Sequence, residues 1–145
     1  MLANALASNH LDAVIVCPSN PFVSIDPIMA LPALAAFLDG RLEGRKVPVI
    51  AVSPIIDGAA VKGPAAKMMG EMGFDVSPRG IADHYRGRID GLVIDTGDEN
   101  YGQAIEAVGI KAHATETLMT DAASETRLAA AVLEFTAIIA DGFGR

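Results

Sequence analysis

The hydrophobic positions of the chain include four short runs that are typical of β-strands. Three runs are continuously apolar and are followed by turn-forming residues: 13–16, 49–52 and 92–94. Continuous rather than alternating runs favour strands that are covered on both faces, as in a parallel sheet. Residues 110–114 differ, because Lys111 and His113 alternate with apolar neighbours. This pattern predicts a strand with one solvent-facing side near an edge of the sheet.

Between these runs, apolar residues recur at steps of three and four positions, which predicts helices. The helical stripes cover residues 28–38, 65–72, 101–108 and 128–139, with a weaker stretch at 79–85. Pro32 is expected to kink or delay the first helix, because proline lacks the amide hydrogen that a helix interior needs. Asp121 is a candidate N-cap of the last helix.

The order of these elements predicts an open α/β sheet. A strand followed by a helix repeats along the chain, and successive parallel strands need right-handed crossovers. We therefore expect a Rossmann-like half, with an open, mainly parallel sheet of about four strands and helices on both faces. We assign residues 1–141 to a single α/β domain and residues 142–145 to a tail.

The charge and the cysteine and histidine content of the chain argue against nucleic-acid partners and against thiolate or zinc sites. The 145 residues include 11 Lys and Arg against 18 Asp and Glu, which gives a net charge of −7 at pH 7. No stretch gathers the cations that bind a phosphate backbone, so we expect no nucleic-acid partner. The single cysteine excludes an internal disulfide framework and a site of several thiolates, and the three histidines lack zinc-ligand spacing.

No segment predicts a membrane span or a secretory leader. The apolar run 27–38 is too short to cross a bilayer and contains two prolines. Residues 1–12 lack the basic start and the longer apolar stretch of a leader. We therefore expect a cytoplasmic protein with no membrane partner.

The loop after the first strand is a candidate binding loop, because ligands of open α/β sheets bind beyond the carboxyl ends of the strands. Residues 17–27 contain three prolines, which stiffen the loop. Asn20 and Ser24 offer polar groups from this fixed frame. Two interpretations stay open: contact with a ligand, or a rigid connection in which Asp26 caps the helix that Pro27 starts.

The loop after the second strand, residues 53–64, contains two glycines and Lys62 and leads to a helix start at Pro64. Backbone amides and a lysine at a helix N-terminus attract anions, notably phosphate. The order of a Walker loop is absent, since the lysine precedes the last glycine. A solvated loop with a surface lysine is the alternative interpretation.

Other polar clusters are weaker candidates. We interpret residues 83–85 (Asp-His-Tyr) as a surface element, because sequence neighbours on a helix point in different directions. The three acids within residues 95–100 could bind Mg²⁺ through their oxygens. We favour the alternative interpretation, a turn followed by a helix cap. Cys17 is expected to be a small buried residue, and the methionines at 68, 69 and 72 to belong to the core.

Five motifs give the chain a family resemblance. Residues 17–28 (CPSNPFVSIDPI) and 52–68 (VSPIIDGAAVKGPAAKM) closely resemble segments of the 2-phospho-L-lactate transferase family, whose members make the deazaflavin coenzyme F(420). Residues 81–85 (IADHY), 91–95 (GLVID) and 117–121 (TLM-x-D) match further segments in the family's own order. The resemblance extends over residues 12–135.

The resemblance implies a magnesium-dependent enzyme and a set of substrate contacts. Such an enzyme transfers a phospholactyl or phosphoenolpyruvyl group from a guanosine diphosphate adduct to the ribityl hydroxyl of the deazaflavin precursor Fo, and GMP leaves. Asn20 and Ser24 would contact substrate, and Pro21 and Ile25 would shape the wall. The residues that would face the nucleotide or its phosphates are Ser53, Lys62 and Gly63. The resemblance assigns no catalytic residue and no metal ligand within this chain.

The chain departs from the family pattern in length. Family members are longer and begin with a strand and a Gly-Gly-x-Gly-Gly turn, and their magnesium-binding aspartates lie in that first half. The chain therefore resembles the C-terminal half, and we expect it to bind Mg²⁺ only through ligands outside it and to have very low transferase activity alone. Exposed sheet edges would favour a homodimer or a complex with a separate N-terminal half. A non-catalytic nucleotide-binding module and an inactive truncated fragment are the alternatives.

Overall fold

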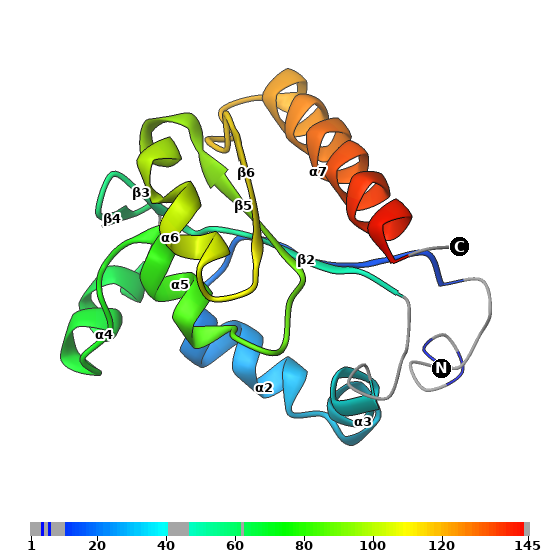
Figure 1. The fold of residues 1–145 in the computed structure, drawn as a ribbon. Helices are drawn as coiled ribbons and strands as arrows, with labels where there is room; N and C mark the ends of the chain where they lie inside the picture. The colour runs from blue at the N-terminus through cyan, green and yellow to red at the C-terminus, as the bar shows by residue number, and fades with distance from the viewer. Residues whose placement is uncertain (1–3, 5, 7–10, 41–46, 62, 144–145) are drawn as a thin grey trace.

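The computed structural model describes residues 4, 6, 11–40, 47–61 and 63–143, which form an α/β fold around one main sheet (Figure 1). The strands of this sheet are β1 (Val14–Val16), β2 (Val49–Val52), β5 (Gly91–Asp95) and β6 (Lys111–Thr115). They lie in the order β1-β2-β5-β6, and every neighbouring pair is parallel. The predicted class, a Rossmann-like parallel sheet of four strands, is confirmed.

The carboxyl ends of the four parallel strands lie at the same end of the sheet. Val14 pairs with Val49, and Gly91 pairs with both Ile50 and Lys111. Because the strands run in one direction, the loops that follow them leave the sheet at the same end. The alternating segment that contains Lys111 forms β6 at an edge of the sheet, as its pattern predicts.

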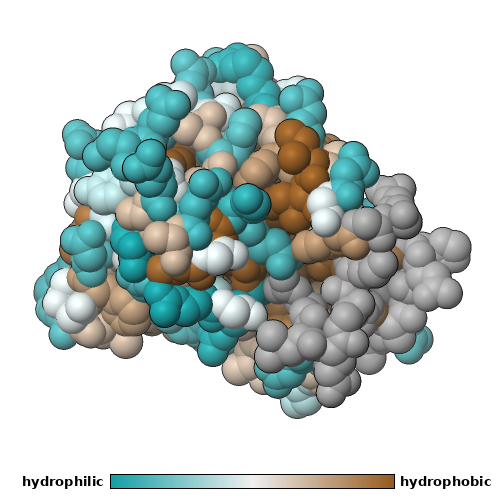
Figure 2. All heavy atoms as spheres, viewed as in Figure 1, coloured by the Kyte–Doolittle hydropathy of each residue, from teal (hydrophilic) through white to brown (hydrophobic). Residues whose placement is uncertain are grey.

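One face of the sheet is covered by α7 (Ala122–Gly142). The side chains that form this interface are Ile50, Val52, Val93, Leu128, Val132, Phe135 and Ile139. The predicted N-cap is confirmed, because Asp121 Oδ1 accepts a hydrogen bond from the Ser124 amide at 2.7 Å. Figure 2 shows hydrophobic residues, in brown, gathered at the surface near α7.

The opposite face carries the remaining helices. These are α2 (Asp26–Met29), α3 (Pro32–Gly40), α4 (Ala65–Glu71), α5 (Pro78–His84) and α6 (Gly102–Glu106). Two further short elements occur, the π-helical turn η1 (Pro21–Ile25) and the 3-10 helix η3 (Thr96–Tyr101). The core residues of this face include Val49, Ala51, Leu92 and Ile94 of the sheet and Phe37, Ile81, Tyr85 and Ile105 of the helical side. The prediction of helices on both faces is confirmed.

Pro32 breaks the predicted helix 28–38 instead of only kinking it. The segments Pro21–Met29 and Pro32–Asp39 meet at an angle of 84°. Proline removes a helical hydrogen bond, and its ring disfavours a helical conformation of the preceding Leu31. The Leu31 carbonyl instead accepts from the amides of Leu34 and Ala35, both at 2.9 Å, and so starts α3.

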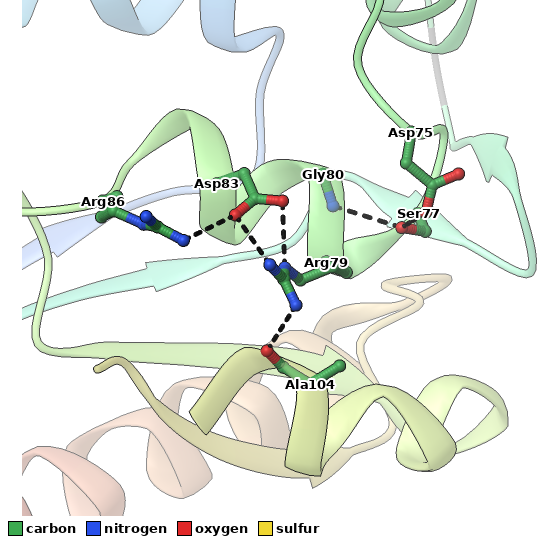
Figure 3. Close-up of polar contacts among 7 residues, drawn as sticks. All are labelled: Asp75, Ser77, Arg79, Gly80, Asp83, Arg86 and Ala104. Atoms are coloured by element: carbon green, nitrogen blue, oxygen red, sulfur yellow. Dashed lines mark hydrogen bonds and ion pairs between the residues drawn. The ribbon is translucent and has the colours of Figure 1, made fainter. Parts of the chain in front are cut away.

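Polar contacts hold α5 in place at its start and against α6 (Figure 3). Ser77 caps the helix, because its Oγ accepts from the Gly80 amide at 3.2 Å and donates to Asp75 at 2.6 Å. Arg79 pairs with Asp83 one turn later and donates from Nη1 to the Ala104 carbonyl of α6 at 2.9 Å. The predicted weak helix at 79–85 therefore exists as Pro78–His84.

The structure corrects three residue-level predictions. Cys17 is exposed rather than buried, because it follows β1 at an edge of the sheet. Residues 83–85 are not a surface element, since Tyr85 is buried and only 12% of the His84 side chain is exposed. Of the three methionines, Met69 is buried in the core but Met72 is 56% exposed.

Two further segments depart from the sequence predictions. A short hairpin, β3 (Ile55–Ile56) and β4 (Ala59–Ala60), lies within the loop after β2. At the end of the chain, α7 continues to Gly142, and Phe143 packs against the core of the α7 face. Residues 144 and 145 of the predicted tail lie outside the described residues.

Among the described residues, no individual helix has both the length and the apolarity of a bilayer span. The segments Pro21–Met29 and Pro32–Asp39 reach that length and composition only when taken together, and they are bent by 84°.

Candidate functional site

A cleft of about 530 Å³ lies at the carboxyl ends of the strands. Its wall comes from three segments that follow β1, β2 and β6 and are distant in sequence. The segment after β1 contributes Pro18, Ser19, Asn20, Val23 and Ser24. The cleft therefore occupies the position where ligands bind in open α/β sheets.

Asn20 organises the segment after β1. Its side-chain Oδ1 accepts hydrogen bonds from the amides of Phe22 at 3.0 Å and Val23 at 3.3 Å. Its backbone carbonyl accepts from the amides of Ser24 and Ile25, both at 3.1 Å. The side-chain amide also donates to the Met68 sulfur of α4 at 3.4 Å. These bonds close η1 and hold Val23 and Ser24 at the cleft.

Ser53 shapes the segment after β2 through a buried turn. Its Oγ donates to the Ile55 carbonyl at 3.0 Å and accepts from the Ile55 amide at 3.2 Å. The hairpin that follows turns at Asp57 and Gly58, whose φ angles are 50° and 71°. Asp98 Oδ2 accepts from the Asp57 amide at 3.0 Å and so anchors the hairpin to η3.

The chain returns to the cleft after this hairpin. Val61, Gly63 and Pro64 line its wall together with Ser53 and Pro54. Gly63 has a φ of 73°, a conformation that side chains with a Cβ rarely adopt, although no other atom would lie within 4 Å of a Cβ there. The glycine is therefore required by the backbone conformation and not by close packing.

The segment after β6 contributes a third part of the wall: Thr117, Met119 and Glu125. Asp95, at the end of β5, holds this segment by accepting from the Thr117 amide at 2.9 Å and from Thr117 Oγ1 at 3.1 Å. Partial burial raises the pKa of Asp95, but hydrogen bonds from Thr117 and Gly97 outweigh it and leave the pKa below its usual value. The sequence analysis did not assign these cleft residues, although their place after a predicted parallel strand was an available signal.

The residues that the sequence analysis singled out fall into three groups. Asn20, Ser24, Ser53 and Gly63 line the one cleft. Pro21 is buried behind the wall, and Ile25 packs against the core and faces a separate apolar hollow beside β1. Lys62 lies outside the described residues. The roles expected for these residues stay predictions.

The described residues do not by themselves fit a Mg²⁺ site. They contain no group of three or more His, Cys, Asp or Glu side chains placed to hold a metal ion. Glu125 is the acid among the described residues that line the cleft. The described part of the wall therefore lacks the pair of carboxylates through which proteins commonly hold Mg²⁺.

Comparisons with known proteins bear on the same segments. The model of the family described as 2-phospho-L-lactate transferase CofD matches residues 3–136. The chain is 45% identical over 119 residues to the 2-phospho-L-lactate transferase of Methanococcoides burtonii, which covers 82% of this chain and 36% of that protein. It is 37% identical over 129 residues to the enzyme of the same name from Methanocaldococcus jannaschii, covering 89% of this chain and 39% of that protein.

A relative with a different name is similar over a comparable length. The phosphoenolpyruvate transferase of Kitasatospora aureofaciens is 37% identical over 123 residues, which is 84% of this chain and 37% of that protein. The chain thus spans between 36% and 39% of the length of these curated relatives.

Proposed function

Because this chain belongs to the 2-phospho-L-lactate transferase CofD family, we propose that it forms one wall of the substrate cleft of a transferase of coenzyme F(420) biosynthesis. The reaction moves a phospholactyl or phosphoenolpyruvyl group from a guanosine diphosphate adduct to a hydroxyl of the deazaflavin Fo. A bond forms between that hydroxyl oxygen and the transferred phosphorus, and the bond from this phosphorus to GMP breaks. The hydroxyl loses its proton, and GMP leaves with the electron pair.

The observation that carries the proposal is the convergence of three family segments on one cleft. Asn20, Ser24 and Thr117 offer polar groups there, while Val23 and Met119 add apolar surface that is 58% and 44% exposed. A volume of about 530 Å³ lies within the range of small-molecule sites. This mixed lining suits a ligand that combines a phosphorylated part with a flat apolar ring.

The proposed contacts follow the position of each segment. Asn20, the N-cap of η1, and Ser24 within η1 contact substrate, while Pro21 and Ile25 support this wall from behind. Ser53 and Gly63 lie along the second segment and face the nucleotide or its phosphates, and Lys62 between them in this segment adds positive charge. Substrates would be positioned by these groups before transfer, which is the main contribution that a protein makes to phosphoryl transfer.

Mg²⁺ belongs to the proposed enzyme but not to the described wall. When bound, it would offset negative charge on the diphosphate. Because the described residues do not fit a magnesium site, we derive no step through the ion and propose that its ligands lie outside this wall. We expect very low transferase activity from this chain alone. A non-catalytic nucleotide-binding module is the second candidate.

The experiment is a calorimetric titration of the chain with GDP and with Fo, each with and without Mg²⁺. We expect saturable GDP binding that Ser24→Ala weakens by about tenfold, the usual effect of removing a hydrogen bond to a charged ligand. Thr126→Ala, which removes an exposed hydroxyl on α7, is the matched control and should bind like the wild type. Product analysis with the guanosine diphosphate adduct then separates a transferase from a binding module. A wild-type chain that binds neither ligand and shows no shift in melting temperature is an inactive fragment.

The proposed protein partner is a second copy of the chain or a separate N-terminal half. The β1 edge is its contact surface, because Val14, Ile15 and Val16 present no charged side chain there. By contrast, β6 carries Lys111 at the other edge, and charged residues discourage strand pairing.

A further inference from the structure

His84 lies in an aromatic cluster that packs against Phe22 of η1. Its ring is edge-on to those of Phe22, Phe74 and Tyr85, with centroid distances of 4.8, 5.4 and 5.0 Å. Its Nε2 lies 3.0 Å from Oδ1 of Asp26. Only 12% of the His84 side chain is exposed. His84, the last residue of α5, therefore contacts both Phe22 and Asp26. Asp26 precedes His84 by 58 positions in the sequence.

The segment that His84 contacts is the wall of the cleft. Phe22 is the second residue of η1, and Asp26 directly follows its last residue. Between them, Val23 and Ser24 line the cleft, while the Phe22 ring packs against His84. His84 thus holds η1 at two points that flank the residues facing the ligand.

Asp26 has two neighbours that contact its Oδ1, His84 and Arg88. Arg88 approaches the same Oδ1 at 3.4 Å from a more exposed position, with 49% of its side chain accessible. Burial, together with the negative charge of Asp26, raises the pKa of Tyr85 far above its ordinary value. The His84 contact is the shorter and more buried of the two, and hydrogen bonds to a charged acceptor are stronger when they are shielded from water.

We infer that His84 is a positioning residue of the cleft: its Nε2–H bond to Asp26 and its edge contact with Phe22 fix η1, and thereby Val23 and Ser24, in the conformation that receives the ligand. No substrate contact by His84 is involved. The effect on the ligand rests on the proposed function, whereas the effect on η1 is independent of it.

The variants separate the hydrogen bond from the packing. His84→Phe keeps a ring for the aromatic cluster but removes the donor to Asp26. His84→Gln loses the ring but places an N–H donor near the position of Nε2, so it is the conservative rescue. Arg79→Met is the matched control on the same helix, because it removes the contacts with Asp83 of α5 and with Ala104 of α6 (Figure 3).

The readouts are amide hydrogen exchange of residues 22–25, melting temperature and GDP affinity. For His84→Phe we expect exchange of these amides to rise by about tenfold and GDP affinity to fall by a similar factor. His84→Gln should restore both toward the wild type. Arg79→Met should lower the melting temperature and leave both the exchange of residues 22–25 and the GDP affinity unchanged.

Each result decides a different point. Wild-type exchange at residues 22–25 in His84→Phe overturns the inference, as does an equal rise in Arg79→Met, which would show general destabilisation. If amide exchange of residues 22–25 rises in His84→Phe but GDP affinity is unchanged, the link between His84 and the cleft is overturned. If η1 loosens but the wild type itself binds no GDP, the proposed function fails and the positioning of η1 by His84 stands.

Discussion

Asp95 and Thr117 are joined by two hydrogen bonds that connect the end of β5 to the cleft segment after β6. Asp95 Oδ2 accepts from the Thr117 amide at 2.9 Å and from its Oγ1 at 3.1 Å. The other carboxylate oxygen accepts from the Gly97 amide at 3.0 Å, at the start of η3. One carboxylate thus fixes two segments that leave the same end of the sheet.

Asp95→Asn should lower the free energy of unfolding by about 1–2 kcal/mol at pH 7, because a charged acceptor is replaced by a neutral one. The pKa of Asp95 lies below its usual value in the folded protein. Its contribution is therefore present above the unfolded pKa and is lost as pH falls through the lower, folded pKa. Urea unfolding from pH 7 down to pH 2 should show the wild type and the variant converging at the acidic end.

Glu99→Gln is the control for this pH dependence. Glu99 is an exposed acid in the neighbouring η3, so its loss changes the charge by the same amount without removing the bonds to Thr117. A gap between Asp95→Asn and the wild type that is as wide at pH 2 as at pH 7 would contradict the assigned role of the carboxylate.

Gly91→Ala should destabilise the contact between the sheet and α7. A Cβ at this position would lie 2.6 Å from Ile139 Cδ1 and 2.7 Å from Phe135 Cε1. Overpacking of this kind costs about 1–3 kcal/mol, which thermal unfolding would detect. Gly102→Ala is the matched control: its Cβ would meet only the Ala112 Cβ at 4.0 Å, and an alanine in α6 should be neutral or slightly stabilising. Equal melting temperatures for the two variants would refute the tight packing at Gly91.

The strands were predictable because burial on both faces leaves a simple pattern. The sequence analysis expected residues 49–52 to form a strand, and β2 is Val49–Val52. The hairpin after it was missed because its strands are only two residues long, too short for a period to be read. The Asp57-Gly58 pair was the available signal, since this dipeptide favours hairpin turns in which both residues have positive φ.

The candidate site was predictable in part. Two loops that follow parallel strands must leave the sheet at the same end, so the common location of Asn20 and Ser53 follows from topology. The contact between His84 and Asp26 does not, because no local spacing relates residues 58 positions apart. The burial of Tyr85 was likewise hidden, since residues 83–85 look polar in sequence and their environment depends on how η1 packs against α5.

Ser77→Ala should lower stability by about 1 kcal/mol, because it removes the cap of α5 and leaves the Gly80 amide without its acceptor (Figure 3). Ser77 is buried, so water cannot replace the lost bond. Chemical denaturation is the measurement. Thr126→Ala serves as the control on an exposed helix surface and should change stability by less than the Ser77 variant does. A Ser77→Ala protein as stable as the wild type would exclude the cap as a significant contribution.

Leu133→Lys should weaken self-association of the chain. Leu133 is 62% exposed and lines an apolar groove of about 300 Å³ that also includes Ile15 of the β1 edge. If a second copy pairs along β1, as proposed, residues of that copy would cover this groove. A lysine at position 133 would then lose its hydration, which opposes the pairing. Ile138→Lys is the matched control, because Ile138 is 66% exposed on the same helix but lines the groove beside Lys111 of β6. Sedimentation velocity should show a lower dimer fraction for Leu133→Lys than for the wild type, with Ile138→Lys unchanged. The reverse pattern would place the contact at β6, and a monomeric wild type at all concentrations would rule out the homodimer.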